Sequence, residues 1–349
     1  MTFEWLVVGA GIHGTYLARE LLDTGVEADE ILLVDRSGSF LGSFERKARA
    51  CGMDTLRSTF VQHVGPDPFG LETFAEGRGR NEELHSTPDH PPRPSLELFI
   101  DHTEHVIDRF DLEALLVERE VTGIDRENDR FAVETTDGVV SAHNVVLAIG
   151  PGDRYRRPSW ASNTPKIEHV WDVDDPRWIN WRHIERELHS FPPGSQARYE
   201  RVREARNEGT MPSYLSREVR ETSSVGIRRG EIAAANDLGG PVSLFGDAGR
   251  IGAADRVFLA TGFEPVYERP LVGAIADSLG LERGYRGVPV LDDETMAWRR
   301  HDGDPSSLFV TGRLAECTAG PLAGNIHGAR RAAERIVGAS AARRTARVA

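Results

Sequence analysis

The sequence has 349 residues, of which 39% are hydrophobic and 28% are charged, and its formal net charge is −13. This composition is typical of a globular protein and excludes a disordered chain, and its negative charge would repel phosphates and so argues against nucleic-acid partners. No apolar run approaches the ~20 residues that a membrane helix needs, and Glu4 stands where a signal peptide would carry Lys or Arg, so we expect a cytoplasmic protein that is not bound to a membrane.

The surplus of carboxylates also fits a high-salt cytoplasm, because acidic surfaces keep proteins soluble there. A GC-rich genome is the alternative explanation for a chain that uses arginine in place of almost every lysine. The two cysteines, Cys51 and Cys317, have neither metal-type nor redox-type spacing, which predicts inert thiols. We therefore expect no metal site.

The N-terminal segment has the pattern of a strand, a glycine loop and a helix. Residues 4–14 read EWLVVGAGIHG, in which the apolar run 5–8 predicts a buried parallel strand. Gly9, Gly11 and Gly14 then form G-x-G-x-x-G, and apolar residues at helical spacing continue to Gly25. Gly9 allows a tight turn, Gly11 lets a pyrophosphate approach the backbone, and Gly14 lets the helix pack close to the strand. This pattern predicts dinucleotide binding at the N–H groups of the helix start.

A second apolar run, residues 31–34, ends in Asp35, about 20 residues beyond the glycine loop, where a carboxylate can accept both ribose hydroxyls. An acid at this position disfavours the 2′-phosphate of NADP. The alternative is a structural turn that has lost its ligand. The cofactor-binding residues that we expect in this unit are Gly9, Ala10, Gly11, Ile12, His13, Gly14, Asp35 and Arg36.

Three later passages distinguish the candidate cofactors FAD and NAD. Residues 119–150 predict a β-meander whose last strand ends in AIGP at Gly150. Residues 242–262 predict a second set of strands and end in Ala260-Thr261-Gly262. The third passage predicts a strand that ends at Gly312, a glycine-bearing loop, and a helix over 328–337.

In this order the motifs resemble the two-dinucleotide flavoprotein superfamily, in particular the flavin-dependent monooxygenases that include lysine and ornithine N-hydroxylases. The resemblance covers nearly the whole chain and implies an α/β fold, a Rossmann-type parallel sheet with a β-meander that binds FAD. It implies that Val121 meets the adenine through its backbone, that Gly312 lies near the ribityl or pyrophosphate, and that the loop 320–325, with Pro321 and Leu322, runs beside the isoalloxazine ring. Many relatives carry an acid where this chain has Arg313, so the ribityl contact there departs from the pattern.

The stretch 53–70 also resembles the segment that runs along the flavin in these relatives. Arg57, Ser58 and Gln62 are its polar residues, and donors near the flavin would stabilise the reduced, anionic ring. The alternative is a solvated loop with a single salt bridge. Residues 77–95, rich in Gly, Pro and charge, predict a mobile loop.

The second G-x-G-x-x-G that opens the NADPH lobe of such relatives is missing between residues 165 and 255. The sequence there is helical and charged, so we expect a discontinuous FAD-binding domain, 1–165 and 225–349. Residues 166–224 would then form a mainly helical insertion, either a remnant of the NAD(P) lobe or a substrate lobe. Binding of NAD(P)H becomes doubtful, and a separate reductase is an alternative electron donor.

Three functions stay open from the sequence. The first is an FAD-dependent oxidoreductase, monooxygenase-like, that acts on a small-molecule substrate. The second is a non-catalytic FAD- or nucleotide-binding protein that has lost NADPH binding. The third is an NAD-dependent dehydrogenase that uses the N-terminal site. No residue stands out as a general acid or base.

Overall fold

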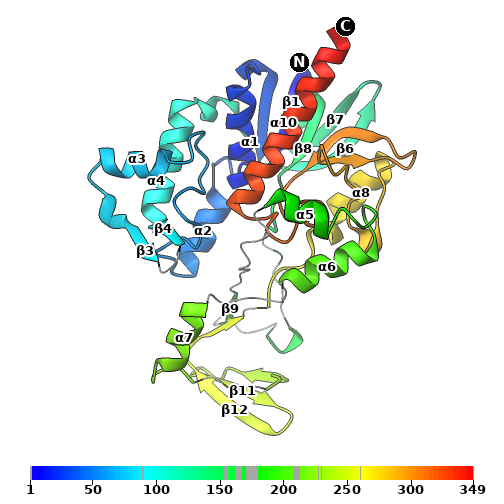
Figure 1. Cartoon of the computed structure of the whole chain (residues 1–349). Helices are drawn as coiled ribbons and strands as arrows, with labels where there is room; N and C mark the ends of the chain where they lie inside the picture. Colours follow the sequence, from blue (N-terminus) through cyan, green and yellow to red (C-terminus); the bar gives the residue numbers. More distant parts are fainter. Residues whose placement is uncertain are drawn as a thin grey trace. The chain divides into compact units, whose positions relative to one another are not determined.

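The structure is a computed structural model that describes residues 2–87, 90–152, 154, 156, 158–161, 167–169, 180–206, 213–226, 228, 230–259 and 261–348. The chain divides into two compact units (Figure 1). Unit 1 comprises Met1–Gly152, Asp175–Ala205 and Val266–Ala349, and unit 2 comprises Asp153–Asp174 and Arg206–Pro265.

Unit 1 is built on a mixed sheet whose central part is parallel. Its strands lie in the order β14-β15-β8-β1-β2-β5, and all neighbours in this order are parallel except β14 and β15. The bounds are β1 Thr2–Val8, β2 Ile31–Asp35, β5 Leu116–Glu118, β8 Gly138–Leu147, β14 Ala297–Arg299 and β15 Pro305–Val310. Strands β6 (Val121–Glu127) and β7 (Arg130–Thr135) add an antiparallel meander to β8. The predicted α/β fold, with a parallel sheet and a β-meander, is therefore confirmed.

The strands of the sheet interior are apolar because they are covered on both faces. Trp5, Leu6 and Val7 of the central strand β1 are completely buried. Helix α1 (Ile12–Asp23) packs against α10 (Ile326–Val348), the two crossing the sheet side by side in Figure 1. The predicted C-terminal helix thus exists and is longer than the sequence pattern indicated.

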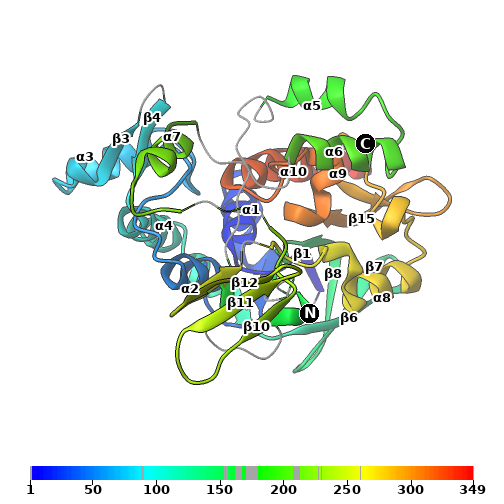
Figure 2. The ribbon, with the colours of Figure 1, turned by 90° about the horizontal axis from the view of Figure 1, so that it is seen from below.

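A subsidiary cluster lies beside α1 in both views of the ribbon (Figures 1 and 2). It contains α2 Gly42–Ala50, α3 Gly70–Gly77, α4 Leu96–Arg109, β3 Leu84–Thr87 and β4 His90–Pro94. The hairpin of β3 and β4 occupies most of the segment that we predicted as a mobile loop. Leu84 pairs with Pro94 in this hairpin, and the prolines of β4, which lack an N–H group, are tolerated because the sheet has only two strands.

The segment 166–224 contains helices, as predicted, but these helices belong to different compact units. Helices α5 (Trp181–Glu187) and α6 (Gln196–Arg206) group with unit 1 up to residue 205, together with α8 (Pro270–Ser278) and α9 (Glu316–Ala319). Unit 2 contains α7 Ser213–Glu221, a parallel pair of β9 Ile167–His169 with β13 Val257–Leu259, and an antiparallel sheet of β10 Ala234–Asn236, β11 Val242–Gly246 and β12 Gly249–Ala254. Its origin from an NAD(P) lobe stays a prediction.

Candidate functional site

The order in which strands are added to the sheet reverses at β1. From β1 the chain proceeds to β2 on one side, whereas β8 and then β15 are added on the other side. In open α/β sheets, ligands bind outside the carboxyl ends of the strands at such a switch point. The loops that leave β1, β8 and β15 meet there, since the Ala148 N–H donates to Val8 O at 2.9 Å and the Thr311 N–H to Leu147 O at 3.1 Å.

The three glycines of the N-terminal loop have different roles in this arrangement. A Cβ on Gly9, whose φ is +107°, would lie 2.6 Å from the carbonyl oxygen of Ala148, and one on Gly14 would lie 1.8 Å from the carbonyl oxygen of Gly9. Both glycines are therefore required by packing. Gly11 is different, because a Cβ placed on it would meet no atom within 4 Å. The cradle that a pyrophosphate would need is thus open at this residue.

Gly11 is also the N-cap of α1, where it has no side chain to accept from the first N–H groups of the helix. Ile12 is the first residue of the helix, with His13 and Gly14 in its first turn. Unsatisfied N–H groups at a helix start, together with the helix dipole, form an anion site. Ala10 is completely buried, and its carbonyl accepts from the Leu41 N–H at 2.9 Å, which ties the loop to the next segment of the chain.

Asp35 ends β2 as predicted, and its carboxylate is already engaged. Oδ2 accepts from the Ala10 N–H at 2.9 Å, and Oδ1 accepts from the Ser37 N–H at 2.8 Å and from the Ser37 hydroxyl at 2.6 Å. A carboxylate offers about four lone-pair sites, so roughly one remains for a ligand. The expectation that Asp35 accepts both ribose hydroxyls would therefore require one of these bonds to be exchanged. Arg36, the next residue, is exposed.

Two further predicted residues, Val121 and Gly150, lie near Asp35 and the glycine loop. The Arg119 N–H donates to the Asp35 carbonyl at 3.1 Å, which places the start of β6 next to the end of β2. Val121 follows there as the first residue of β6 and is buried. Gly150 follows β8 with a φ of +52°, which favours glycine, two residues beyond the Ala148 that touches Gly9.

The C-terminal loops lie against the glycine loop. Gly312 has a φ of +71°, and a Cβ there would lie 3.9 Å from the His13 ring. His13 Nδ1 and the Thr311 hydroxyl are hydrogen-bonded at 2.8 Å, so the glycine loop and the loop after β15 are directly linked. Burial lowers the pKa of His13 to about 4, and the backbone at 324–325 offsets this only in part, so the imidazole is neutral at pH 7.

The loop 320–325 packs onto the same region. Pro321 and Leu322 are buried, and a Cβ on Gly324 would lie 2.8 Å from Cγ of Arg313. Gly320 has a φ of +86° and caps α9. The two C-terminal glycine segments that the resemblance singled out are therefore neighbours, and Arg313 lies against the second of them.

The stretch 53–62 also reaches the glycine loop through the hydrophobic core. Leu56 and Phe60 belong to a buried cluster that includes Ile326, the first residue of α10, and against which Ile12 packs. Arg57, Ser58 and Gln62 lie between or beside these anchors and are half-buried. The Leu56 N–H donates to Pro94 O at 2.9 Å, and the Phe60 N–H donates to Pro92 O at 2.9 Å, so the β3–β4 hairpin holds this stretch in place.

Sequence reasoning missed the residue that anchors the next part of this stretch. Arg19 of α1 is only 1% exposed, and its Nε donates to Val64 O at 3.2 Å while its guanidinium pairs with Glu20 at 2.6 Å. It also missed Thr311 as the partner of His13. No sequence signal marks Arg19, because an arginine in a helix is normally exposed. Thr311 stands directly before a glycine that we had singled out and could have been included.

Other candidate chemistry is limited in the described ranges. Among those residues, no group of three His, Cys, Asp or Glu side chains could hold a metal ion. The described helices include none that is both long and apolar enough to cross a membrane. Of the Ala260-Thr261-Gly262 motif, Ala260 lies outside the described residues, Thr261 donates its hydroxyl hydrogen to Arg156 O, and Gly262 O accepts from the Arg156 N–H at 3.0 Å.

Comparison with known proteins agrees with this geometry. Residues 6–152 match a family model described as FAD-NAD(P)-binding, whereas no curated protein matches the chain. Among solved structures, the chain is similar to an ornithine N-hydroxylase from Kutzneria sp. 744 in a structure with reduced FAD, NADP+ and L-ornithine (TM-score 0.76, 14% identity, covering 99% of this chain and 100% of that chain). It is also similar to an ornithine hydroxylase from Pseudomonas aeruginosa (TM-score 0.65, 15% identity, 97% and 98% covered).

A bacillithiol disulfide reductase from Staphylococcus aureus is similar over the same extent, with a TM-score of 0.62, 14% identity, and 98% and 99% of the two chains covered. At such low identity these likenesses establish the fold. The resemblance to the N-hydroxylases that the motifs indicated is thereby confirmed, and the predicted two-dinucleotide fold is supported.

Proposed function

We propose that this chain, which has the fold of the FAD/NAD(P)-binding superfamily, binds FAD in the crevice at the switch point and acts as an FAD-dependent oxidoreductase. One observation carries the proposal. The glycine loop, Asp35, Gly150 and the loop after Gly312 converge at the carboxyl ends of four parallel strands, β1, β2, β8 and β15. An extended dinucleotide needs contacts along its whole length, and loops at the ends of adjacent strands would provide them.

The residues present fit an extended dinucleotide. The open space at Gly11 and the N–H groups at the start of α1 would take the pyrophosphate, and Asp35 would hold a ribose hydroxyl. The backbone at Val121 would meet the adenine. The loops at Gly312 and 320–325 would enclose the other half of the cofactor.

The flavin would supply the redox chemistry, and the protein would supply orientation, electrostatics and control of water. Arg57, Ser58 and Gln62 are the polar side chains that would donate hydrogen bonds toward the ring. A cationic guanidinium there would stabilise a reduced, anionic ring. Arg313 would replace the acid of many relatives, so the ribityl chain would be held by backbone groups in this loop instead.

We further propose that reduction of the flavin does not use a second glycine loop. Across 165–255, the sequence lacks a second G-x-G-x-x-G, and the described part of unit 2 holds short strands and α7 rather than a strand, glycine loop and helix. The electrons would come from a separate reductase or from NAD(P)H bound elsewhere. The fold likeness favours a monooxygenase-like reaction on a small molecule.

The test is to purify the full chain, record its visible spectrum, and identify any cofactor released on denaturation. We expect a flavin spectrum and released FAD, or stoichiometric uptake of added FAD by colourless protein. Colourless protein that fails to take up FAD but binds NAD would instead support the dehydrogenase alternative. Anaerobic addition of NADH or NADPH to the FAD-loaded protein then distinguishes the two electron donors: rapid bleaching would identify NAD(P)H bound elsewhere on the chain, and a flavin that stays oxidised would favour a separate reductase.

A further inference from the structure

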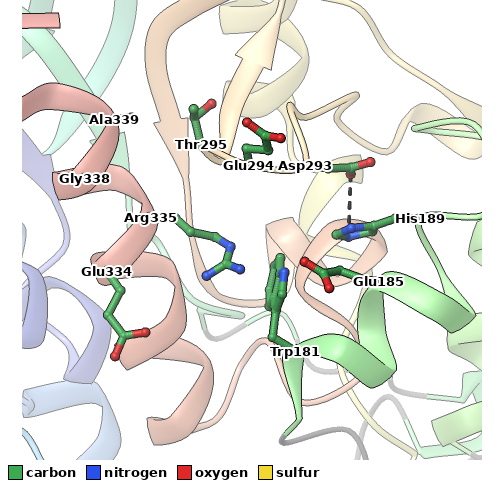
Figure 3. A pocket seen from close by; sticks show the side chains of 10 residues that line it. All are labelled: Trp181, Glu185, His189, Asp293, Glu294, Thr295, Glu334, Arg335, Gly338 and Ala339. Carbon is green, nitrogen blue, oxygen red and sulfur yellow. Dashed lines mark ion pairs between the residues drawn. The ribbon is translucent and has the colours of Figure 1, made fainter. Parts of the chain in front are cut away.

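A pocket of about 610 Å³ lies between α5, α10 and the turn that precedes β14, all within unit 1 (Figure 3). Its volume is in the range of small-molecule sites. Its walls carry aromatic and charged side chains, and it does not include any residue of the glycine loop or of the loop after Gly312.

Arg335 of α10 is the unusual group in this pocket. The guanidinium carbon lies 3.3 Å from the centre of the Trp181 ring, and Figure 3 shows the guanidinium directed at the indole. Among the described residues it makes no hydrogen bond and no ion pair, and its Nε is buried without a partner. Burial, reinforced by the neighbouring Arg331, lowers the pKa of Arg335 below its ordinary value, which still leaves it charged at pH 7.

Polar groups removed from water are normally hydrogen-bonded, and several arginines of this chain have one buried N–H without an acceptor. Arg335 differs from them because none of its nitrogens has a bond among the described residues. Its donors form a planar fork that matches a carboxylate. The contact of the guanidinium carbon with the Trp181 ring restrains the position of this fork at the wall of the pocket. This arrangement indicates an external acceptor, of which a planar carboxylate is the best match.

The carboxylates of the pocket fall into two groups. Asp293 is bonded to both terminal nitrogens of Arg198, at 2.6 and 3.0 Å, and Glu334 is paired with two arginines of its own helix. Glu185 and Glu294 line the same pocket, are exposed, and have no side-chain partner among the described residues. The unpaired charges of the pocket are therefore one guanidinium and two carboxylates.

This set of charges selects among ligands. A simple anion would be repelled by Glu185 and Glu294, and a simple cation would be repelled by Arg335. We propose that the pocket binds a small zwitterion, an ω-amino carboxylic acid, with its carboxylate on Arg335 and its ammonium group toward Glu185 and Glu294. The proposal rests on these contacts alone and does not depend on FAD binding.

The test is calorimetric titration of the full chain, at the lowest salt concentration that keeps it folded, with ω-amino acids from glycine to 6-aminohexanoate. Butyrate and butylamine serve as probes that carry only one of the two charges. We expect at least one ω-amino acid to bind at least tenfold more tightly than either probe. The proposal is overturned if no ω-amino acid binds at millimolar concentrations, or if butyrate or butylamine binds as tightly.

Variants then locate the site. Arg335→Gln should weaken binding of the best ω-amino acid at least tenfold, and Glu185→Gln combined with Glu294→Gln should weaken it severalfold. Arg330→Gln is the matched control, because Arg330 lies on the same helix but already pairs with Glu334 at 3.1 Å. Unfolding temperatures of all variants check that they are folded. Equal binding by Arg335→Gln and Arg330→Gln would refute the assignment of the carboxylate to Arg335, even if zwitterions bind elsewhere.

Discussion

The glycine loop allows one prediction that separates binding from folding. A methyl group at Gly11 would meet no atom within 4 Å, and the residue has a φ of −70°, so Gly11→Ala introduces neither a clash nor strain. Loss of glycine at an N-cap costs about 0.5–1 kcal/mol, and the reduced freedom of the unfolded chain offsets about the same amount. The free energy of unfolding should therefore change by less than about 1 kcal/mol.

FAD binding should respond very differently to Gly11→Ala. The methyl group would fill the space that the pyrophosphate needs beside the backbone, and we expect affinity to fall at least tenfold, which is about 1.4 kcal/mol. The assay is titration of apoprotein with FAD, followed by flavin fluorescence, alongside urea unfolding without FAD. Unchanged FAD affinity would refute the role that we assign to Gly11.

Two matched glycines complete this experiment. In Gly14→Ala the Cβ would lie 1.8 Å from the Gly9 carbonyl oxygen, about 1.5 Å closer than a normal C···O contact, so we expect a loss of roughly 1–3 kcal/mol of stability or more. Gly77 ends α3 with open space around it, and Gly77→Ala should raise stability by up to about 1 kcal/mol without changing FAD affinity. Equal stability of the Gly14 and Gly77 variants would show that the packing argument is wrong.

Three further predictions concern polar groups. Asp35→Asn should weaken FAD binding and cost about 1–2 kcal/mol of stability even without FAD, because the amide has a single acceptor oxygen and its NH2 group would face the N–H of either Ala10 or Ser37. Equal stability of the apo forms in urea would contradict this. Arg198→Met would leave Asp293 without its bidentate partner, and because this carboxylate is 24% exposed and can be partly hydrated, we expect a loss of roughly 1–3 kcal/mol in urea unfolding; an unchanged free energy of unfolding would show that the pair is dispensable. Burial and the adjacent His63 ring lower the pKa of His102 to about 3, so its contribution to stability is fully present above about pH 6.5 and is lost below that pH, by up to ~1.4 kcal/mol per pH unit. His13 and His63, whose pKa values burial lowers to about 4, add to the same loss. Between pH 7 and acid, His102→Leu should therefore lose less of its free energy of unfolding than the parent protein does. Identical pH profiles of the two proteins in urea titrations would contradict the assignment.

The pattern from β1 to β2 was predictable because its causes are local. A buried parallel strand requires a continuous apolar run, the tight turn requires glycine at Gly9, and the acid of Asp35 follows the second run directly. The meander was predictable for the same reason. Alternating side chains and turn residues, such as Asn128 with its φ of +60°, specify each hairpin within a few residues.

The position of the helical segments required the tertiary structure. Periodicity predicts α5 and α6, but it does not say that they pack with unit 1, whereas α7 belongs to unit 2. Arg198 shows the reason, because a helix with so many charges looks exposed on every face. Only the fold brings Asp293, which is 95 residues away, to its guanidinium and makes burial of that face possible.

The glycine loop and the acid that follows it could thus be predicted from local sequence, because steric demands on a turn and on a buried strand are met by neighbouring residues. The distant groups that complete the site become visible only in the folded chain. The bond between His13 and Thr311 joins residues 298 positions apart, and the buried contact of Arg19 with Val64 spans 45. Such contacts depend on strand order and helix packing, and pair energies of this kind leave no periodic pattern in the sequence.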